Sequence, residues 1–255
     1  MILAILQART SSNRLPGKVL KPILGVPMLL RQIERISDSE RIDKLVVATS
    51  TDTSDDELAK VLMEAGVHVY RGSLTNVLDR FYQVASQYSA DNIVRLTGDC
   101  PLIDPEIVDN VIESHLVKNA DYTSNALNPT YPDGLDVEVI KFKALEKSWE
   151  EGKLPSELEH VTSYIYNNKD KFVICNVSND QDLSTLRWTV DEKEDLEFVE
   201  KIYSELYLDN KKFRLNNILK LLRKKPELIK INSKFTRNEG FQKSQLADIE
   251  YLKGK

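Results

Sequence analysis

The first eighteen residues of the chain contain three cations whose types and spacing suit phosphate binding. Arg9, Arg14 and Lys18 follow an apolar run, Ile2–Leu6, and hydroxyl-bearing residues lie between the first two cations. The apolar run predicts a buried strand, and ligands of open α/β sheets bind beyond the carboxyl ends of such strands. An arginine fork can contact phosphate through two hydrogen bonds, whereas lysine acts as a point charge. The loop therefore predicts a nucleotide-phosphate site, the alternative being a solvated basic turn.

This loop differs from the two common glycine-rich phosphate loops. It contains neither GxGxxG nor GxxxxGKS/T, and Gly17 is the only glycine before Gly25. A loop so poor in glycine cannot surround phosphates mainly with backbone amides. We therefore expect side-chain charge to bind the phosphates.

A second candidate site lies at Asp99. The predicted strand Asn92–Leu96 leads into Gly98, which permits a sharp turn, and Asp99 then projects at the same sheet edge as the basic loop. Mg²⁺ usually binds one or two carboxylates together with phosphates and water. Because a Gly-Asp turn is also a common loop, the segment alone leaves both interpretations open.

Asp191 is the candidate for a second carboxylate. It follows a predicted strand, Thr185–Val190, and precedes a predicted helix, Glu192–Leu206. A capping aspartate is an ordinary structural feature of a helix N-terminus, so this alternative stays open on the residues alone. His160 is equally open: it is either a general base that titrates near neutrality or a helix residue packed against a neighbour.

Gln7–Leu20 carries the pattern QARxxSxRLPGKxL, which resembles the opening of the cytidylyltransferases that make CMP-activated sugars. That group includes the 3-deoxy-manno-octulosonate and acylneuraminate enzymes, and the resemblance is strongest to the spore-coat-polysaccharide type. Further segments resemble the family in the same order, with GDxP at Asp99, EHVT at Glu159 and VDxxxDL at Asp191. The resemblance covers most of the chain. It departs from the family at Asp133, where a basic residue is more common.

The resemblance implies a CTP-dependent enzyme that transfers CMP from CTP to a sugar or sugar acid and releases pyrophosphate, in surface polysaccharide or glycoconjugate biosynthesis. It also implies Mg²⁺ as cofactor and a homodimer. The candidate cytosine readers are backbone groups near Leu6–Ala8 and residues within Leu74–Arg80, although Asp79 and Arg80 also suit an ordinary helix-surface pair. Asp195 is expected to be structural. The implied site residues are catalytic Arg14, Lys18, Asp99 and Asp191; metal-binding Asp99 and Asp191; nucleotide-binding Gln7, Ala8, Arg9, Arg14, Lys18, Arg71, Arg95 and Asp99; and acceptor-binding Asp136, Glu159 and His160.

Three other functions remain as alternatives. A nucleotidyltransferase with a phosphorylated or phosphonate acceptor would give a CDP-linked product. A glycosyltransferase of similar fold also binds a nucleotide diphosphate beside Mg²⁺, but its DxD motif is not evident after a predicted strand. A non-catalytic nucleotide-binding module is the third.

The elements that must position these residues alternate between strand and helix. This alternation predicts an α/β, Rossmann-like nucleotidyltransferase fold with a mainly parallel sheet covered by helices on both faces. We expect one such domain over residues 1–223, followed by a polar tail, 224–255, that belongs to the same domain or extends from it. The expected strands are Ile2–Leu6, Lys44–Ala48, Val67–Tyr70, Asn92–Leu96, Tyr122–Asn125, Leu135–Ile140, Phe172–Val177 and Thr185–Val190. The expected helices are Met28–Ile36, Ser54–Glu64, Leu74–Tyr88, Pro105–Val117, Lys141–Glu150, Ser156–Asn167, Glu192–Leu206 and Leu215–Arg223.

Composition limits the partners and the compartment. The formal net charge of −5 over 255 residues argues against broad nucleic-acid binding, which needs a basic face. The two cysteines, Cys100 and Cys175, are too few for a disulfide framework or a zinc cluster. The N-terminal apolar run is too short for a signal peptide or a membrane span. We therefore expect a cytoplasmic protein.

Overall fold

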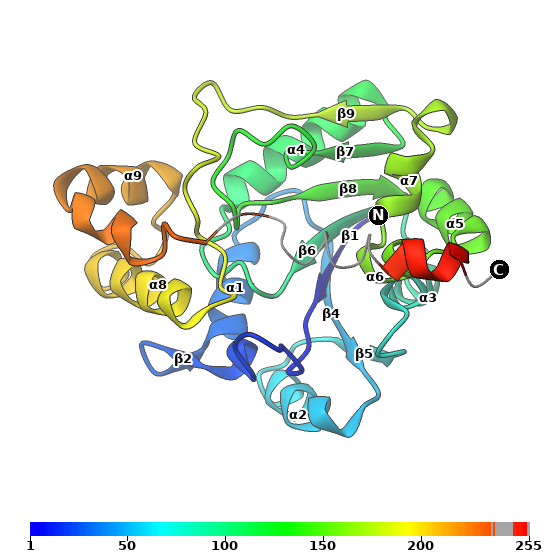
Figure 1. The fold of residues 1–255 in the computed structure, drawn as a ribbon. Coiled ribbons are helices and arrows are strands. Elements are labelled where there is room, and N and C mark those ends of the chain that lie inside the picture. The colour runs from blue at the N-terminus through cyan, green and yellow to red at the C-terminus, as the bar shows by residue number, and fades with distance from the viewer. Residues whose placement is uncertain (236, 238–246, 254–255) are drawn as a thin grey trace.

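The computed structural model describes residues 1–235, 237 and 247–253, and its centre is a seven-stranded sheet (Figure 1). Only β8 runs antiparallel to its neighbours, so the expectation of a mainly parallel sheet is confirmed. In sheet order the strands are β5 (Val69–Gly72), β4 (Lys44–Ser50), β1 (Ile2–Gln7), β6 (Asn92–Thr97), β8 (Glu138–Lys141), β7 (Tyr122–Ser124) and β9 (Ile174–Asn176). A separate small hairpin pairs β2 (Pro22–Ile23) with β3 (Val26–Pro27).

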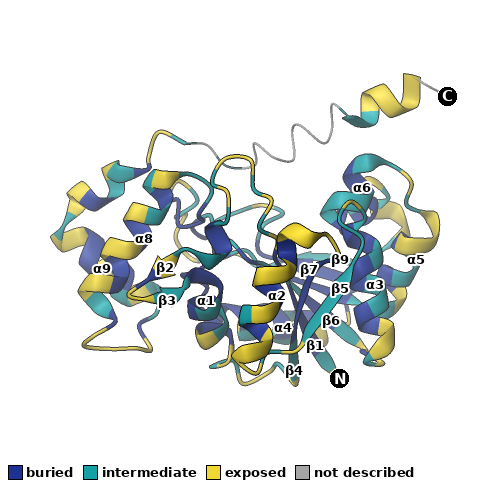
Figure 2. Cartoon of the chain, turned by 90° about the horizontal axis from the view of Figure 1, so that it is seen from below, coloured by how far each residue is buried: buried dark blue, intermediate teal, exposed yellow. Residues whose placement is uncertain are grey.

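Helices cover both faces of this sheet because its strands are apolar on both sides. In β1, Ala4 and Leu6 pack into one core, whereas Leu3 and Ile5 pack into the other. The buried residues form a continuous layer along the sheet in Figure 2. The first core is covered by α1 (Met28–Ile36), α2 (Asp56–Glu64), α4 (Pro105–Lys118), α8 (Lys193–Leu206) and α9 (Leu215–Lys224). The second is covered by α3 (Val77–Gln87), α5 (Phe142–Glu151), α6 (Pro155–His160) and α7 (Ser163–Asn167).

The strand order reverses direction at β1. From β1 the chain adds β4 and then β5 on one side, and it then crosses to add β6 on the other. A crevice forms at such a switch point, outside the carboxyl ends of the parallel strands. The residues after Gln7 and after Thr97 therefore lie next to each other at one edge of the sheet, since these two residues are register partners.

The reversed strand β8 adds residues to this same edge. Its antiparallel register places Glu138, at its first position, opposite Arg95 near the carboxyl end of β6. The segment that precedes Glu138 in the chain must therefore approach from the crevice side.

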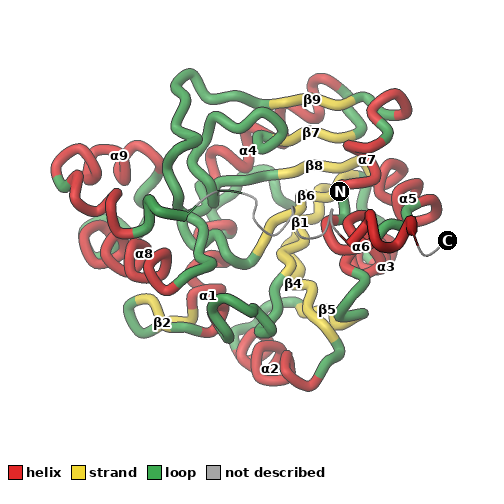
Figure 3. The backbone as a smooth tube through the Cα atoms, viewed as in Figure 1, coloured by secondary structure: helices red, strands yellow, loops and turns green. Residues whose placement is uncertain are grey.

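The expected strand over Thr185–Val190 is wrong. The segment is a loop that begins in a turn at Thr185, and it makes only an isolated bridge between Arg187 and Asp133. Its backbone pairs with other loops instead: Val190 N donates to Asp99 O at 2.8 Å. Figure 3 shows the two long loops, after β7 and after β9, lying beside each other.

The expected helix over Ser156–Asn167 is interrupted, giving α6 and α7. The break is at Val161, which is fully buried and has a φ of 59°. A β-branched residue is strained in this conformation, and such strain persists where surrounding packing imposes it. The interruption turns the residues on either side, His160 and Thr162, toward the crevice edge.

The other expected elements are present, with boundaries that shift by a few residues. Short 3₁₀ helices add to them: η1 (Lys18–Leu20), η2 (Thr53–Asp55), η3 (Lys169–Lys171) and η4 (Pro226–Ile231). From the expected tail, η4 packs against α8 and α9 through the buried Leu228. The rest of the tail lies outside the described residues except for Arg237 and 247–253. No helix within the described part of the chain is long and apolar enough to cross a membrane.

His115 on α4 gives the fold a testable pH dependence. Its ring is buried between Thr123 Oγ1 and Asn92 Oδ1, each at 3.1 Å. Burial, with a smaller contribution from Lys141, lowers the pKa of His115 from 6.5 to about 4. Because the folded pKa is the lower one, the stabilisation is present above pH 6.5 and is lost as the pH falls toward 4. We expect the wild type to lose about 2 kcal/mol more unfolding free energy than His115→Gln between pH 7 and pH 5.

Denaturant titrations at the two pH values measure this difference. Equal losses in the two proteins would show that His115 is not the titrating group.

Candidate active site

The basic loop after β1 is held in place by one buried carboxylate. Asp55 Oδ1 accepts hydrogen bonds from Thr10 N at 2.7 Å and Thr10 Oγ1 at 2.9 Å. Burial alone would raise the pKa of Asp55. Hydrogen bonds from Ser50 and Thr10 outweigh this effect and lower the pKa below its usual value, so the carboxylate is ionised. Gly17, with a φ of 66°, closes the loop by donating its N–H to Thr10 O at 3.0 Å. The loop thus delivers Lys18 to the crevice at a fixed position.

Lys18 joins the two predicted carboxylates. Its Nζ lies 3.1 Å from Asp99 Oδ2 and 2.9 Å from Asp191 Oδ1, and it donates to Val190 O at 2.8 Å. Burial lowers the pKa of Lys18, but the two carboxylates more than offset this, so the net shift is upward. Burial raises the pKa of Asp99, and Lys18 and neighbouring hydrogen bonds lower it to about 2. Lys18 and Asp99 are therefore both charged at neutral pH.

Arginines hold the other side of Asp191. Its Oδ2 lies 2.8 Å from a guanidinium nitrogen of Arg14 and 3.2 Å from one of Arg187. Behind it, the fully buried Asp195 binds Arg187 through two hydrogen bonds of 2.9 Å and accepts the backbone N–H of Asp191 at 2.9 Å. Asp195 therefore fixes the backbone that carries the candidate metal ligand.

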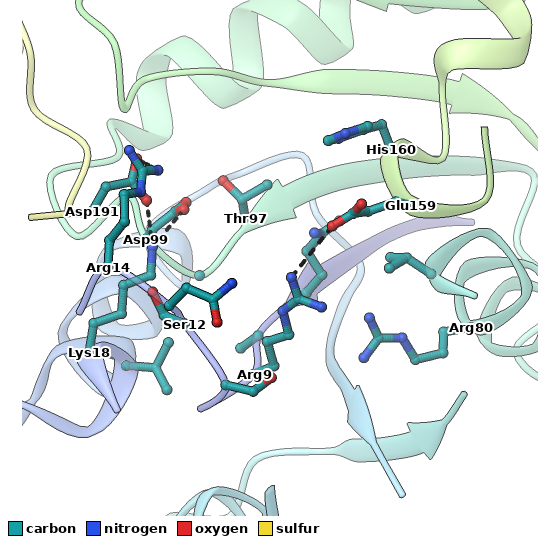
Figure 4. A pocket seen from close by; sticks show the side chains of 17 residues that line it. Arg9, Ser12, Arg14, Lys18, Arg80, Thr97, Asp99, Glu159, His160 and Asp191 are labelled. Carbon is teal, nitrogen blue, oxygen red and sulfur yellow. Dashed lines mark hydrogen bonds and ion pairs between the residues drawn. The ribbon is translucent and has the colours of Figure 1, made fainter. Parts of the chain in front are cut away.

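Two cavities meet at these carboxylates. The basic cavity, of about 380 Å³, contains the cationic loop and is shown in Figure 4. It is lined by Gln7, Ala8, Arg9, Ser11, Ser12, Asn13, Arg14, Lys18, Val19, Val77, Arg80, Thr97, Gly98, Asp99, Glu159, His160 and Asp191. The acidic cavity, of about 430 Å³, is lined by Arg14, Arg95, Thr97, Asp99, Cys100, Ala126, Leu127, Asp133, Asp136, Glu138, His160, Thr162, Tyr166, Arg187, Thr189 and Asp191. The cavities share Arg14, Thr97, Asp99, His160 and Asp191.

Arg80 lies at the end of the basic cavity away from Asp99 and Asp191 (Figure 4). Its side chain is 2% exposed, and its Nε and Nη1 have no hydrogen-bond partner. Burial, with the nearby Arg9, lowers its pKa to about 10. Unsatisfied buried donors are costly, so this end of the cavity favours a ligand that supplies hydrogen-bond acceptors.

The two carboxylates have the donor chemistry that Mg²⁺ requires. Asp99 and Asp191 offer carboxylate oxygens at one position, held 3.1 and 2.9 Å from the same ammonium. Among the described residues, no group of three or more His, Cys, Asp or Glu could hold a metal alone. Mg²⁺ commonly binds one or two carboxylates plus substrate phosphates, so this pair fits a metal that arrives with a phosphate ligand.

The structure brings most of the predicted site residues together. Arg14, Lys18, Asp99 and Asp191 form one ion-paired cluster. Gln7, Ala8 and Arg9 line the basic cavity, and Asp136 lines the acidic cavity.

Four other predicted site residues lie outside the ion-paired cluster. Arg71 lines neither cavity, because its guanidinium binds Ser50 O and Asp56. Arg95 lines the acidic cavity rather than the basic one, and Glu159 lines the basic cavity, where it lies 3.5 Å from Arg9. His160 lines both.

Sequence reasoning missed several site residues. Arg187 lies within the predicted strand Thr185–Val190 and was given no site role, yet it binds both Asp191 and Asp133. Thr162 and Tyr166 lie within the segment predicted as one continuous helix, so the sequence pattern did not indicate that they line the acidic cavity. Arg80 is buried rather than part of a helix-surface pair. The one sequence signal for Arg80 was its position in Leu74–Arg80, the segment that contains candidate cytosine readers.

Comparisons with known proteins show the family to which the chain belongs. The profile of the cytidylyltransferase family matches residues 3–239. The chain is 38% identical over 236 residues to the uncharacterized protein MJ1063 of Methanocaldococcus jannaschii, covering 91% of this chain and 94% of that protein. It is 35% identical over 216 residues to the spore coat polysaccharide biosynthesis protein SpsF of Bacillus subtilis, covering 80% and 87%. A solved cytidylyltransferase from Leptospira borgpetersenii superposes with a TM-score of 0.85 at 33% identity, covering 89% and 96%. The chain therefore belongs to the cytidylyltransferase family of CTP-dependent nucleotidyltransferases.

Proposed function

We propose that this protein transfers CMP from CTP to a hydroxyl of a sugar or sugar acid and releases pyrophosphate, in surface polysaccharide or glycoconjugate biosynthesis. The observation that supports this most strongly is the junction of the two cavities at Asp99 and Asp191. A nucleotide in the basic cavity and an acceptor in the acidic cavity would meet there. Holding two reactants in this relation removes much of the entropic barrier to reaction.

The triphosphate would bind at the cationic end of the basic cavity. We assign Arg14 and Lys18 to the β- and γ-phosphates, since both already bind anionic oxygens of Asp191 there. Phosphoryl transfer depends on positioning and on stabilising charge at the leaving group. These two cations would stabilise the charge that develops on pyrophosphate.

Mg²⁺ would be held by Asp99 and Asp191. When bound, the metal would neutralise charge on the phosphates and favour ionisation of the attacking hydroxyl. The chain's own contribution is to hold both carboxylates at one position beside Lys18, which also lowers the pKa of Asp99.

Arg80 is our candidate for recognising the base. The Arg80 guanidinium lines the basic cavity, and its N–H donors suit cytosine, which offers acceptors at O2 and N3, better than uracil, whose N3 carries a proton. A site built to hydrogen-bond one group rejects an analogue that cannot make the bond.

His160 is our candidate for taking the proton of the acceptor hydroxyl. It lines both cavities at the end of α6. Burial, together with Arg95, lowers its pKa, which favours the neutral ring that a general base requires. We further expect a cytoplasmic homodimer, as the sequence resemblance implies.

Calorimetric titration with CTP, UTP, dTTP, ATP and GTP, each with Mg²⁺, tests this function. We expect CTP to bind at least about tenfold more tightly than UTP, and Arg80→Lys to reduce that ratio because lysine lacks the planar fork. Arg223→Lys, an exposed change on α9, is the matched control. Preference for another nucleotide would contradict the cytidylyl assignment.

Lys18→Ala tests the assignment of the distal phosphates. We expect CTP affinity to fall about 100-fold, or about 2.7 kcal/mol, because a buried cation that binds the triphosphate is lost. CMP affinity should change much less, since CMP lacks the β- and γ-phosphates. Lys21→Ala, three residues on and outside both cavity linings, is the control. Equal losses of affinity for CTP and CMP would show that Lys18 does not bind the β- and γ-phosphates.

A further inference from the structure

We infer that Arg95 is a positioning residue for the nucleotide: it holds the side-chain amide of Gln7 so that the amide NH₂ group is presented to the basic cavity. This role rests on the proposed function and adds a residue to it. Gln7 lines the basic cavity, whereas Arg95 lines only the acidic one. Arg95 would therefore act on the nucleotide through Gln7.

The sheet brings these two side chains together from neighbouring parallel strands. Arg95 on β6 is the register partner of Ile5 on β1, and Gln7 lies two residues after Ile5. Side chains two residues apart in a strand share one face of the sheet, so Gln7 and Arg95 are diagonal neighbours on that face. Arg95 Nε donates to Gln7 Oε1 at 3.2 Å.

This hydrogen bond fixes which way the Gln7 amide is turned. A guanidinium donates hydrogen bonds and cannot accept them, so the amide oxygen must face Arg95 and the amide nitrogen must face away from it. Within the described part of the chain, that nitrogen donates no hydrogen bond. Gln7 thus keeps two N–H donors for a ligand of the basic cavity.

Arg95 is itself held by Glu138, its cross-strand neighbour on β8. The guanidinium binds Glu138 Oε2 directly, and the two side chains are 12% and 8% exposed. Glu138 Oε1 accepts hydrogen bonds from Tyr122 and Tyr166 at 2.6 Å and from Thr162 at 2.7 Å. Burial alone would raise the pKa of Glu138, but Arg95 and these hydrogen bonds outweigh this effect, so the carboxylate is ionised. A buried ion pair fixed in this way leaves Arg95 little freedom to release Gln7.

The nucleotide portion that Gln7 would bind is the one that CTP and CMP share. Gln7 is the last residue of β1 and the register partner of Thr97, which lies two residues before Asp99. Arg14 and Lys18, from the loop that follows β1, are already assigned to the β- and γ-phosphates. We therefore expect the Gln7 N–H groups to donate to an oxygen of the cytidine monophosphate portion.

Calorimetric titration with CMP and with Mg²⁺–CTP, in the absence of acceptor, tests this role. Arg95→Lys keeps the charge that Glu138 requires, but lysine lacks the planar fork that reaches two partners at once. We expect Gln7→Leu and Arg95→Lys each to weaken the binding of both nucleotides at least about fivefold. Gln87→Leu, an exposed change at the end of α3, and Arg223→Lys are the matched controls.

The double variant Gln7→Leu/Arg95→Lys separates positioning from an independent effect. If Arg95 acts through Gln7, the double variant should bind each nucleotide no more than about twofold more weakly than Gln7→Leu alone. A merely structural role of Arg95 would instead give losses that multiply. If Arg95→Lys does not fold, Arg95→Met/Glu138→Gln, which removes both members of the ion pair, takes its place with the same expected losses.

Three results would overturn the role of Arg95. These are unchanged nucleotide affinity in Arg95→Lys, losses that multiply in the double variant, and a loss for CTP without one for CMP. Unchanged nucleotide affinity with a raised KM for the acceptor would place Arg95 in contact with the acceptor instead. Failure of the wild-type protein to bind CTP would remove the proposed function itself.

Discussion

Replacing Asp99 with asparagine is expected to reduce kcat by about 1,000-fold, or about 4 kcal/mol of transition-state stabilisation. The amide has nearly the same shape, but it removes one of the two anionic ligands proposed for Mg²⁺. Lys18 keeps its contacts with Asp191 and Val190, so the nucleotide site should persist. We therefore expect the dissociation constant of CTP to change by no more than about threefold.

Steady-state pyrophosphate release from Mg²⁺–CTP in the presence of an accepted sugar or sugar acid measures this change. Asp209→Asn is the matched control for the same chemical replacement at an exposed position. Near-normal kcat in Asp99→Asn would show that Asp99 is not a metal ligand. A parallel loss of CTP affinity would instead show that Asp99 supports the nucleotide site.

Asp195→Asn is expected to lower the free energy of unfolding by about 3–5 kcal/mol. Asp195 is fully buried and accepts hydrogen bonds from Arg187, Asn232 and the backbone N–H groups of Asp191 and Glu192. An amide has one oxygen instead of two, so several donors lose their acceptor. The Arg187 guanidinium also loses its main buried counterion.

Chemical denaturation at pH 7 measures this loss. Asp209→Asn should change the unfolding free energy by no more than about 0.5 kcal/mol, as for most surface substitutions. If Asp195→Asn were as stable as the control, the ion-paired support beneath Asp191 would not contribute to the fold as described.

The sequence was most informative where local pattern and topology agree. Short apolar runs and amphipathic stretches predicted the parallel strands and most helices, and the rule for parallel sheets then placed Lys18 and Asp99 at one edge. Their ion pair at 3.1 Å agrees with that expectation. Asp191 lies at the same edge, although the strand expected before it is a loop whose Val190 N–H donates to Asp99 O.

Other features depend on contacts that a sequence pattern does not encode. The adjacent charged residues Asp79 and Arg80 suggest an exposed face of a helix. Only the packing of α3 shows that Arg80 is buried. Val161 looks like an ordinary helix residue, and its positive φ results from tertiary packing. Arg237 lies about one hundred residues from Asp136 in sequence, and no local motif predicts their pairing.

A crystal structure with CTP and Mg²⁺ tests the central claim most directly, namely that the nucleotide and the acceptor meet at Asp99 and Asp191. We predict the cytosine beside Arg80, the β- and γ-phosphates on Arg14 and Lys18, and the metal on the two aspartates. The α-phosphate would then face the acidic cavity. A nucleotide bound in the opposite direction, or with its α-phosphate turned away from the acidic cavity, would contradict the account.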